Sequence, residues 1–552
     1  GLIDTLHTMY KDGKIAESDY RMWFMLNNKT KISVLTPLGE TDQATIINGI
    51  GQGSFGAALA SSLNIGCGID KITRGICTAR IGELELNSLI FQDDIAKMNY
   101  TMEDTRKGAR DVGRLLESKQ LRANTSKSKF VVIGSQESRT EMLKDAELNP
   151  VMMGETVIEN SQVEKYLGDQ IHEDGCEASI SATIDGRING AIKAGKEIVA
   201  SLNHPATMGH KMAEVAVTEY ASKVISKLIS NCDSWIDLTD NHITRMQNVQ
   251  DNYFRDVFQV CASGTPLCMI RLDSQTLHIK YQIILRKIKQ IRKTISKEDD
   301  NLAKKALLAG QYTCAGGDLL TECIEWCKKL DIRCVTKGTD PNPKKAKMDE
   351  FKLKQGLWRE NDKDIKVEKE KRSKVKDIPM PTKKYERNYL ANLTTANARI
   401  WFRYRSKIIS DIKGNQSTQW TGRMECRHCN TGSDETQEHI EICTKFAKER
   451  ASINLNEGTG KLIFWRRVMY KLKVMKLENK DFFDPKFGIM DSSIDATSED
   501  QAIMQVHTSV PSEETRTRGR EGLRISAGVV VSARDISVGE VTQVTPRSEV
   551  LR

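Results

Sequence analysis

The stretch Leu89-Ile90-Phe91-Gln92-Asp93-Asp94-Ile95-Ala96-Lys97-Met98 decides how the amino-terminal part of this chain is interpreted. An apolar run leads into two adjacent carboxylates and a second, mostly apolar run leads out, which predicts a β-hairpin with an acidic turn. Asp is a common turn residue, so the pair alone is most simply a solvated turn. The alternative is that divalent cations, which take oxygen ligands, offset the repulsion between the two carboxylates.

Length and composition bound the class of protein. A chain of 552 residues, 39% of them hydrophobic, is long enough for several domains and can fill their cores. Thirteen cysteines in a chain without secretory features favour reduced thiols and metal ligation over a disulfide framework. No apolar run approaches the length of a membrane span, so we expect neither a transmembrane helix nor a membrane partner. Since the chain opens on Gly1 and not on Met, we expect it to be a fragment.

Three further elements accompany the acidic pair in a fixed order. A glycine-rich stretch, Gly51-Gln52-Gly53, precedes it and allows close approach of a ligand to the backbone, although it matches no nucleotide-binding fingerprint. A helix over residues 101–119, the polar stretch Asn124–Ser128 and a strand at 130–134 follow it. Tyr166-Leu167-Gly168 then lies within an expected strand at 163–171, where Gly168 allows a bulge or a close backbone contact.

In this order and at these separations, the four elements resemble motifs B, C, D and E of a reverse transcriptase palm. The nearest class is that of the non-long-terminal-repeat, or LINE-type, retrotransposons, and the resemblance covers about residues 1–300. It implies an α+β fold of the right-hand polymerase type. We expect a truncated palm followed by a helical thumb, a basic connector and a small zinc-binding module.

The resemblance also implies roles for individual residues. The catalytic pair would be Asp93 and Asp94, which hold Mg²⁺ or Mn²⁺, and Asp93 would be the direct ligand. Other implied roles are proton donation to pyrophosphate (Lys127), the pocket for nucleotide and template (Gly51, Gln52, Gly53 and the aromatic position Phe91) and the primer grip (Tyr166, Leu167, Gly168). Two such metal ions stabilise the attacking oxygen and the leaving pyrophosphate in an in-line displacement.

The remaining sequence is divided by periodicity and charge. Isoleucines recur at helical spacing over residues 176–300. Residues 341–390 have an excess of basic side chains, with 16 Lys and Arg against 9 Asp and Glu. Cys314, Cys323, Cys327 and Cys334 fit no zinc spacing, so we expect buried free thiols there. The expected regions are partial fingers and palm (1–175), helical thumb (176–300), helical and basic connector (301–400), zinc-knuckle region (401–486) and disordered tail (487–552). Within the connector, we expect Pro341–Pro381 to be exposed and partly helical.

A second cluster of chemically specialised residues lies near the carboxyl end. Cys426, Cys429, His439 and Cys443 have the spacing Cys-x2-Cys-x9-His-x3-Cys, which predicts a tetrahedral zinc site, with His428 a neighbour and not a ligand. The cluster also resembles the carboxyl-terminal Cys-Cys-His-Cys element of the same retrotransposon proteins. Positive charge and stacking surface suited to nucleic acid are expected nearby, at Trp420, Arg423, Arg427 and Trp465-Arg466-Arg467.

The resemblance implies RNA-directed DNA synthesis in the nucleus. The partners would be template RNA, primer or target DNA and deoxynucleoside triphosphates. Two alternatives stay open, a non-catalytic nucleic-acid-binding remnant of a retroelement and a maturase-like RNA-binding protein. The zinc-knuckle spacing argues against the maturase-like alternative.

The same resemblance generates a prediction about activity. The family's motif A supplies another metal-binding aspartate, which we expect upstream of Gly1, and Asp4 cannot replace it because it lies in an amphipathic helix pattern. Without that ligand, this chain should not extend an oligo(dT) primer on poly(rA) when Mg²⁺ is supplied. Metal-dependent incorporation of labelled dTTP by the purified chain would contradict this prediction.

Overall fold

The computed structural model describes most of the chain between residues 2 and 478. The described residues are 2–27, 31–32, 35–36, 39–40, 42, 44–45, 65, 69, 79–81, 84–86, 88–91, 94–119, 121, 123–204, 212–236, 238–261, 264–310, 319–332, 343–378, 380, 393–409, 411–416, 424–429, 431–478 and 531–533. Within them, no helix has both the length and the apolar character needed to cross a membrane.

The amino-terminal segment contains helices α1 (Leu2–Lys11) and α2 (Glu17–Asn27) and two antiparallel strand pairs. β1 (Lys31–Ile32) pairs with β4 (Ala44–Thr45), and β2 (Leu35–Thr36) pairs with β3 (Gly39–Glu40). Leu6 and Met9 of α1 are buried, whereas Met22 and Met25 of α2 are exposed. α1 therefore joins the core of this end of the molecule.

The predicted acidic hairpin is present as β7 (Ser88–Phe91) and β8 (Asp94–Lys97). The two strands are antiparallel, with Phe91 opposite Asp94 and Ser88 opposite Lys97. β5 (Ala79–Ile81) and β6 (Leu84–Leu86) form a second hairpin. Of the tail expected to be disordered, the structure describes only β15 (Val531–Ala533), which pairs in parallel with β8.

One face of the acidic hairpin packs on α4 (Met102–Ser118), the helix predicted at 101–119. Ile90 and Ile95 share a core there with Val112, Leu116 and Phe130. The predicted strand at 130–134 is shorter than expected, since only β9 (Lys129–Phe130) is extended, in parallel with β12 (Glu159–Asn160). The adjoining elements are α5 (Gln136–Leu148) and the antiparallel pair β10 (Met152–Met153) and β11 (Thr156–Val157).

The predicted single strand at 163–171 is wrong. The chain forms an antiparallel hairpin there, β13 (Val163–Tyr166) and β14 (Asp169–His172), with Tyr166 opposite Asp169. The turn residues Leu167 and Gly168 both have positive φ, 48° and 93°, which suits the tight turns that match strand twist. Gly168 therefore closes a hairpin and does not mark a bulge.

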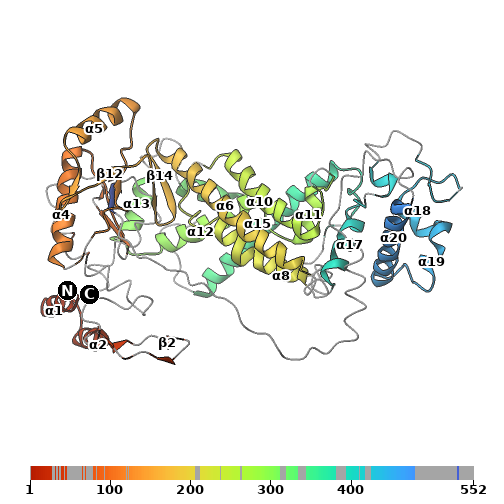
Figure 1. Cartoon of the computed structure of the whole chain (residues 1–552), viewed down its shortest axis with the longest axis horizontal. Helices are drawn as coiled ribbons and strands as arrows, with labels where there is room; N and C mark the ends of the chain where they lie inside the picture. Colours follow the sequence, from red (N-terminus) through yellow and green to blue (C-terminus); the bar gives the residue numbers. More distant parts are fainter. Residues whose placement is uncertain are drawn as a thin grey trace.

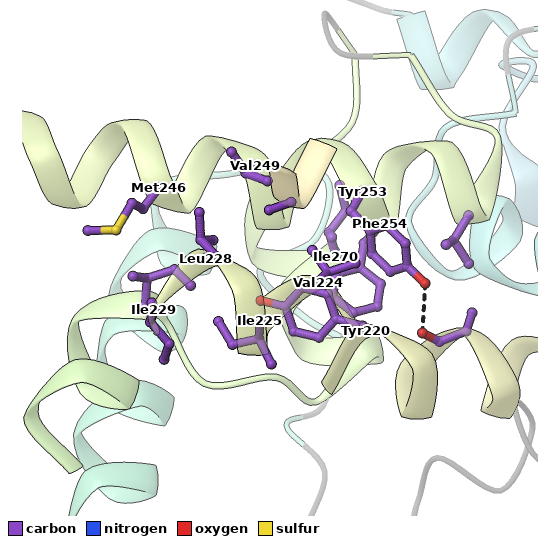
Figure 2. Close-up of a cluster of buried hydrophobic side chains, with 14 of the residues drawn as sticks. Tyr220, Val224, Ile225, Leu228, Ile229, Met246, Val249, Tyr253, Phe254 and Ile270 are labelled. Carbon is purple, nitrogen blue, oxygen red and sulfur yellow. Dashed lines mark hydrogen bonds between the residues drawn. The ribbon is translucent and has the colours of Figure 1, made fainter. Parts of the chain in front are cut away.

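The region predicted to be helical forms a bundle of packed helices (Figure 1). Its elements are α6 (Cys176–Leu202), α8 (Met212–Glu219), the π-helical turn η1 (Tyr220–Val224), α9 (Ile225–Leu228), α10 (Asp240–Phe258), α11 (Leu267–Ser274) and α12 (Ile279–Ile295). Figure 2 shows their shared core, where the rings of Tyr220, Tyr253 and Phe254 lie together. The Tyr253 hydroxyl donates to the Ala216 carbonyl at 2.7 Å, next to the π-helical turn.

The expectation of a largely exposed connector after residue 340 is wrong. α13 (Leu302–Gly310) and α14 (Leu319–Lys329) lead to the long helix α15 (Pro343–Glu370). Leu353, Leu357 and Ile365 of α15 are buried against the preceding helices because they recur at helical spacing within the charged sequence. Cys323 and Cys327 are buried in the same core and form no disulfide, as predicted, while Cys314 and Cys334 lie outside the described residues.

The carboxyl-terminal module begins with α17 (Thr395–Arg405) and ends with α20 (Gly458–Glu478). Between them lie the short elements η2 (Lys413–Gln416), α18 (Gln437–Ile442), η3 (Thr444–Phe446) and α19 (Ala447–Arg450). In Figure 1, α18, α19 and α20 lie at one end of the molecule, and α4 and α5 lie at the other.

Candidate metal centre and palm hairpin

The four predicted zinc ligands come together in the carboxyl-terminal module. One ligand atom from each of Cys426, Cys429, His439 and Cys443 lies within 4.8 Å of all the others. Sγ of Cys429 is 3.2 Å from Nε2 of His439, and the sulfurs of Cys426 and Cys443 are 4.0 Å apart. Tetrahedral zinc, with Zn–S bonds of about 2.3 Å, would hold its sulfurs about 3.8 Å apart. The group could therefore hold one metal ion.

The first pair of ligands is presented by a short β-ribbon. The Cys426 N–H donates to the Ser433 carbonyl and the Glu435 N–H to the Met424 carbonyl, both at 2.8 Å. Gly432 lies between the two strands with a φ of +70°, a conformation that glycine adopts without strain. The ribbon turns the chain back so that Cys426 and Cys429 face α18.

The second pair of ligands is presented by α18. The Thr436 hydroxyl caps this helix by accepting from the His439 N–H at 3.1 Å. His439 and Cys443 are four residues apart, and the Cys443 N–H donates to the His439 carbonyl at 2.7 Å. This spacing places both side chains on the same side of the turn.

A buried ion pair fixes the knuckle between the first two cysteines. The Glu435 side chain is fully buried, and both of its oxygens accept from the Arg427 guanidinium, at 2.7 and 3.0 Å. Burial opposes ionisation of Glu435, but Arg427 outweighs it and holds the pKa of the carboxyl below its ordinary value. Arg427 is therefore a structural residue here, which corrects its prediction as a nucleic-acid contact.

His428 lies outside the ligand group, in agreement with the sequence. Its side chain is buried, its ring packs edge-on against Phe446 at 5.2 Å, and its Nε2 is 3.9 Å from the Glu435 carboxylate. The His428 ring thus packs on Phe446, which belongs to the same core as Cys426 and Cys443.

The apolar support of the site comes from α20. Phe464, Trp465, Val468 and Leu472 are fully buried in a core shared with Cys426 and Cys443. The Trp465 indole donates to Glu441 at 3.1 Å. The predicted stacking role of Trp465 is therefore wrong, because its ring is inside the module. Trp420 and Arg423 lie outside the described residues.

The thiols differ in how readily they ionise. Burial raises the pKa of Cys426 to about 12 and also raises the pKa of Cys443. Burial opposes the Cys429 thiolate as well, but hydrogen bonds from the Thr431 hydroxyl and backbone and from His439 outweigh it and lower the pKa of Cys429 to about 6. A cation that binds here must displace protons from the two buried thiols.

The acidic hairpin is only partly described. Asp94 is half-buried at the start of β8, opposite Phe91, while Asp93 and the glycine-rich residues Gly51, Gln52 and Gly53 lie outside the described residues. Lys127 is exposed in a turn, and its N–H donates to the Asn124 carbonyl at 3.1 Å.

The predicted primer-grip residues lie on the other hairpin. Leu167 and Gly168 are at its tip, and Tyr166 is buried behind β7 and β8 in a core with Leu89 and Met98. The structure therefore packs the β13–β14 hairpin against the β7–β8 hairpin through Tyr166.

A scan against protein-family models gives no match for this chain, and no curated protein matches it. The assignment of function therefore depends on the motifs and on the geometry described above.

The Arg427–Glu435 pair predicts a role for a residue that is not a ligand. Glu435→Gln removes the charge that Arg427 requires, so the knuckle loses its anchor and metal affinity should fall about tenfold or more. Competition with a chromophoric chelator measures this affinity. Glu438→Gln is the matched control, because Glu438 is 68% exposed and forms its ion pair with Lys407 on the surface. Equal affinities of the two variants would contradict the proposed anchoring role.

Proposed function

We propose that this chain is part of a LINE-type reverse transcriptase, whose activity is RNA-directed DNA synthesis by two-metal nucleotidyl transfer. The observation that carries the proposal is the register of β7 and β8. Phe91 lies opposite Asp94 in this register, so Asp94 stands at the end of the hairpin where β7 and β8 reverse. A hairpin with this register can present two carboxylates to divalent cations.

The packing of the hairpin suits that task. Its strands are held from both faces, by Val112 and Leu116 of α4 on one and by Tyr166 and Ala306 of α13 on the other. Most of the catalysis in phosphoryl transfer comes from holding the reacting groups in position. Metal ligands on a hairpin that is packed on both faces would be held rigidly enough for this purpose. Mg²⁺ or Mn²⁺, when bound, would supply charge to the attacking and leaving oxygens.

The neighbouring hairpin supports the same proposal. Tyr166, Leu167 and Gly168 lie at the junction of β13 and β14, and the backbone of this turn is tied to the helical region. Asn231 donates to the Leu167 carbonyl at 3.1 Å and Arg187 to the Gly168 carbonyl at 2.9 Å. A turn fixed in this way can hold a primer strand in register with the acidic tip, while the helices that follow would contact the duplex as a thumb.

We propose Zn²⁺ as the ion of the Cys426–Cys443 centre, because three sulfurs and one imidazole suit a closed structural zinc site. The purified chain should contain about one equivalent of zinc, and less than about half an equivalent would contradict the site. Cys429→Ser should lose the ion, whereas Cys176→Ser, at an exposed cysteine outside the cluster, should keep it. Because binding displaces protons from the Cys426 and Cys443 thiols, zinc affinity should fall as the pH is lowered from 8 to about 5.

The acidic tip gives a second experiment. Electron paramagnetic resonance should detect Mn²⁺ bound to the chain in the presence of a primer–template duplex, and Asp93→Asn with Asp94→Asn should abolish the signal of bound ion. Asp12→Asn, at an exposed aspartate of the amino-terminal segment, should leave it unchanged. Unchanged Mn²⁺ binding would contradict a palm metal site.

A second candidate is a non-catalytic nucleic-acid-binding protein. One observation favours it: the metal centre has its own core, which is distinct from the cores around the hairpin. A module built in this way can bind nucleic acid without a working palm. The Mn²⁺ experiment separates the two candidates, since only the polymerase requires ions at Asp93 and Asp94.

A further inference from the structure

The outward side of α20 carries an exposed set of side chains that the metal centre does not use. We call it the Tyr470 face and define it by Ile463, Arg466, Arg467, Tyr470 and Leu477. These residues recur at intervals that place them on one side of the helix. Tyr470 is 54% exposed and Leu477 70% exposed, and both arginines are exposed as well.

The inward side of α20 explains why this face is presented in a fixed orientation. Phe464, Trp465, Val468 and Leu472 are fully buried around the metal ligands. The helix therefore places the Trp465 indole inside the module and the guanidinium groups of Arg466 and Arg467 on its surface. An exposed aromatic ring at Tyr470 takes the place that the sequence suggested for Trp465.

Charge identifies the kind of partner. α20 contains six basic residues and one acidic residue, Glu478, at its last position. Three of the lysines are engaged within the module, Lys461 with Glu441, Lys471 with Glu449 and Lys476 with Asp411. Arg466 makes no hydrogen bond or ion pair with any residue that the structure describes, and Arg467 donates only to the Glu449 carbonyl, at 3.3 Å. Positive charge therefore surrounds an exposed aromatic ring.

We propose that the Tyr470 face binds single-stranded nucleic acid, with Tyr470 stacked on a base and Arg466 and Arg467 on the flanking phosphates. Exposed aromatics between cations are the recurring elements of single-strand binding, because every unpaired base offers a π-face. A duplex conceals those faces, and an apolar protein partner would have to desolvate two guanidinium groups. The proposal rests on the nucleic-acid-handling part of the proposed function but not on polymerase activity.

The test measures fluorescence anisotropy of labelled oligonucleotides of about twenty nucleotides with the zinc-loaded full chain. Tyr470→Ala should weaken binding of single-stranded RNA and DNA at least about fivefold, and Tyr470→Phe should restore it, because stacking requires the ring and not the hydroxyl. Arg466→Ala should reduce the slope of log affinity against log salt by about 0.7, the value for one lost phosphate contact on a single strand, while Tyr470→Ala should leave that slope unchanged. Lys448→Ala, at an exposed lysine of α19, is the control for loss of one charge in the same module, and its affinity should change less than about twofold.

Several outcomes would overturn the proposal. These are unchanged affinity of Tyr470→Ala for single strands, equal effects of Tyr470→Ala and Lys448→Ala, and a loss of duplex affinity in Tyr470→Ala as large as its loss of single-strand affinity. Zinc content is measured for every variant, so that loss of the module is not mistaken for loss of the face. If the Asp93 and Asp94 substitutions leave Mn²⁺ binding unchanged while Tyr470→Ala behaves as expected, only the polymerase proposal fails. If no oligonucleotide binds the zinc-loaded chain, the inference fails while the Mn²⁺ experiment still decides the proposal for the palm.

Discussion

The β7–β8 hairpin is buried on both faces, and this constraint organises the amino-terminal half of the structure. In β8, Ile95 points into the core formed with α4, and its neighbour Ala96 points into the core formed with Tyr166 and α13. A shift of register by one residue would exchange the two sets of side chains. The position of the turn is therefore determined by apolar packing along the strands. The adjacent carboxylates do not stabilise it, because like charges repel. Packing on both faces also brings segments distant in sequence, such as α13, against the hairpin.

Burial of β8 on both faces creates one unusual environment, that of Lys97. Its side chain is almost fully buried beside α4, and burial lowers the pKa of its amine to about 8. Gly108 provides the space, because a Cβ at that position would lie 3.0 Å from Cε of Lys97. The close approach of α4 to β8 thus depends on a glycine in the helix. Glycine in a helix interior costs stability relative to alanine, and here the packing of the lysine stem compensates for that cost.

The sequence predicted the elements whose residues carry local signals. Helix α4 begins at its Thr101 cap, and the acidic hairpin follows from apolar strands around a polar turn. The cysteine–histidine spacing identified the four residues that the structure brings together as a candidate metal centre. The predictions were wrong where contacts between segments distant in sequence determine which side chains are buried. Lysines and acids dominate α15, yet Leu353 and Leu357 bury one side of it, and no local signal shows that α12 and α14 are there to receive them. Trp465 and Tyr470 are both aromatic residues in a basic helix, and only the position of the metal ligands determines which of them is buried. Leu167 was misread because a non-glycine residue with positive φ is uncommon.

Helix α17 connects the helical region with the carboxyl-terminal module, because it packs on the helical region with one side and on the module with the other. Toward the helical region, the Phe402 ring stacks on Phe258 at 4.1 Å, and Arg405 forms a 3.0 Å ion pair with the buried Asp273. Toward the module, the Tyr404 ring lies 5.3 Å from that of Trp465, and its hydroxyl accepts from Lys461 at 3.2 Å. A module attached through aromatic stacking and a buried ion pair cannot rotate freely about a linker. The orientation of α20, and with it the direction of the Tyr470 face, is therefore set by the same contacts that hold α17 on α10 and α11. A strand bound at that face would be held at a fixed distance and angle from the helices, and would not be tethered loosely at the end of the chain.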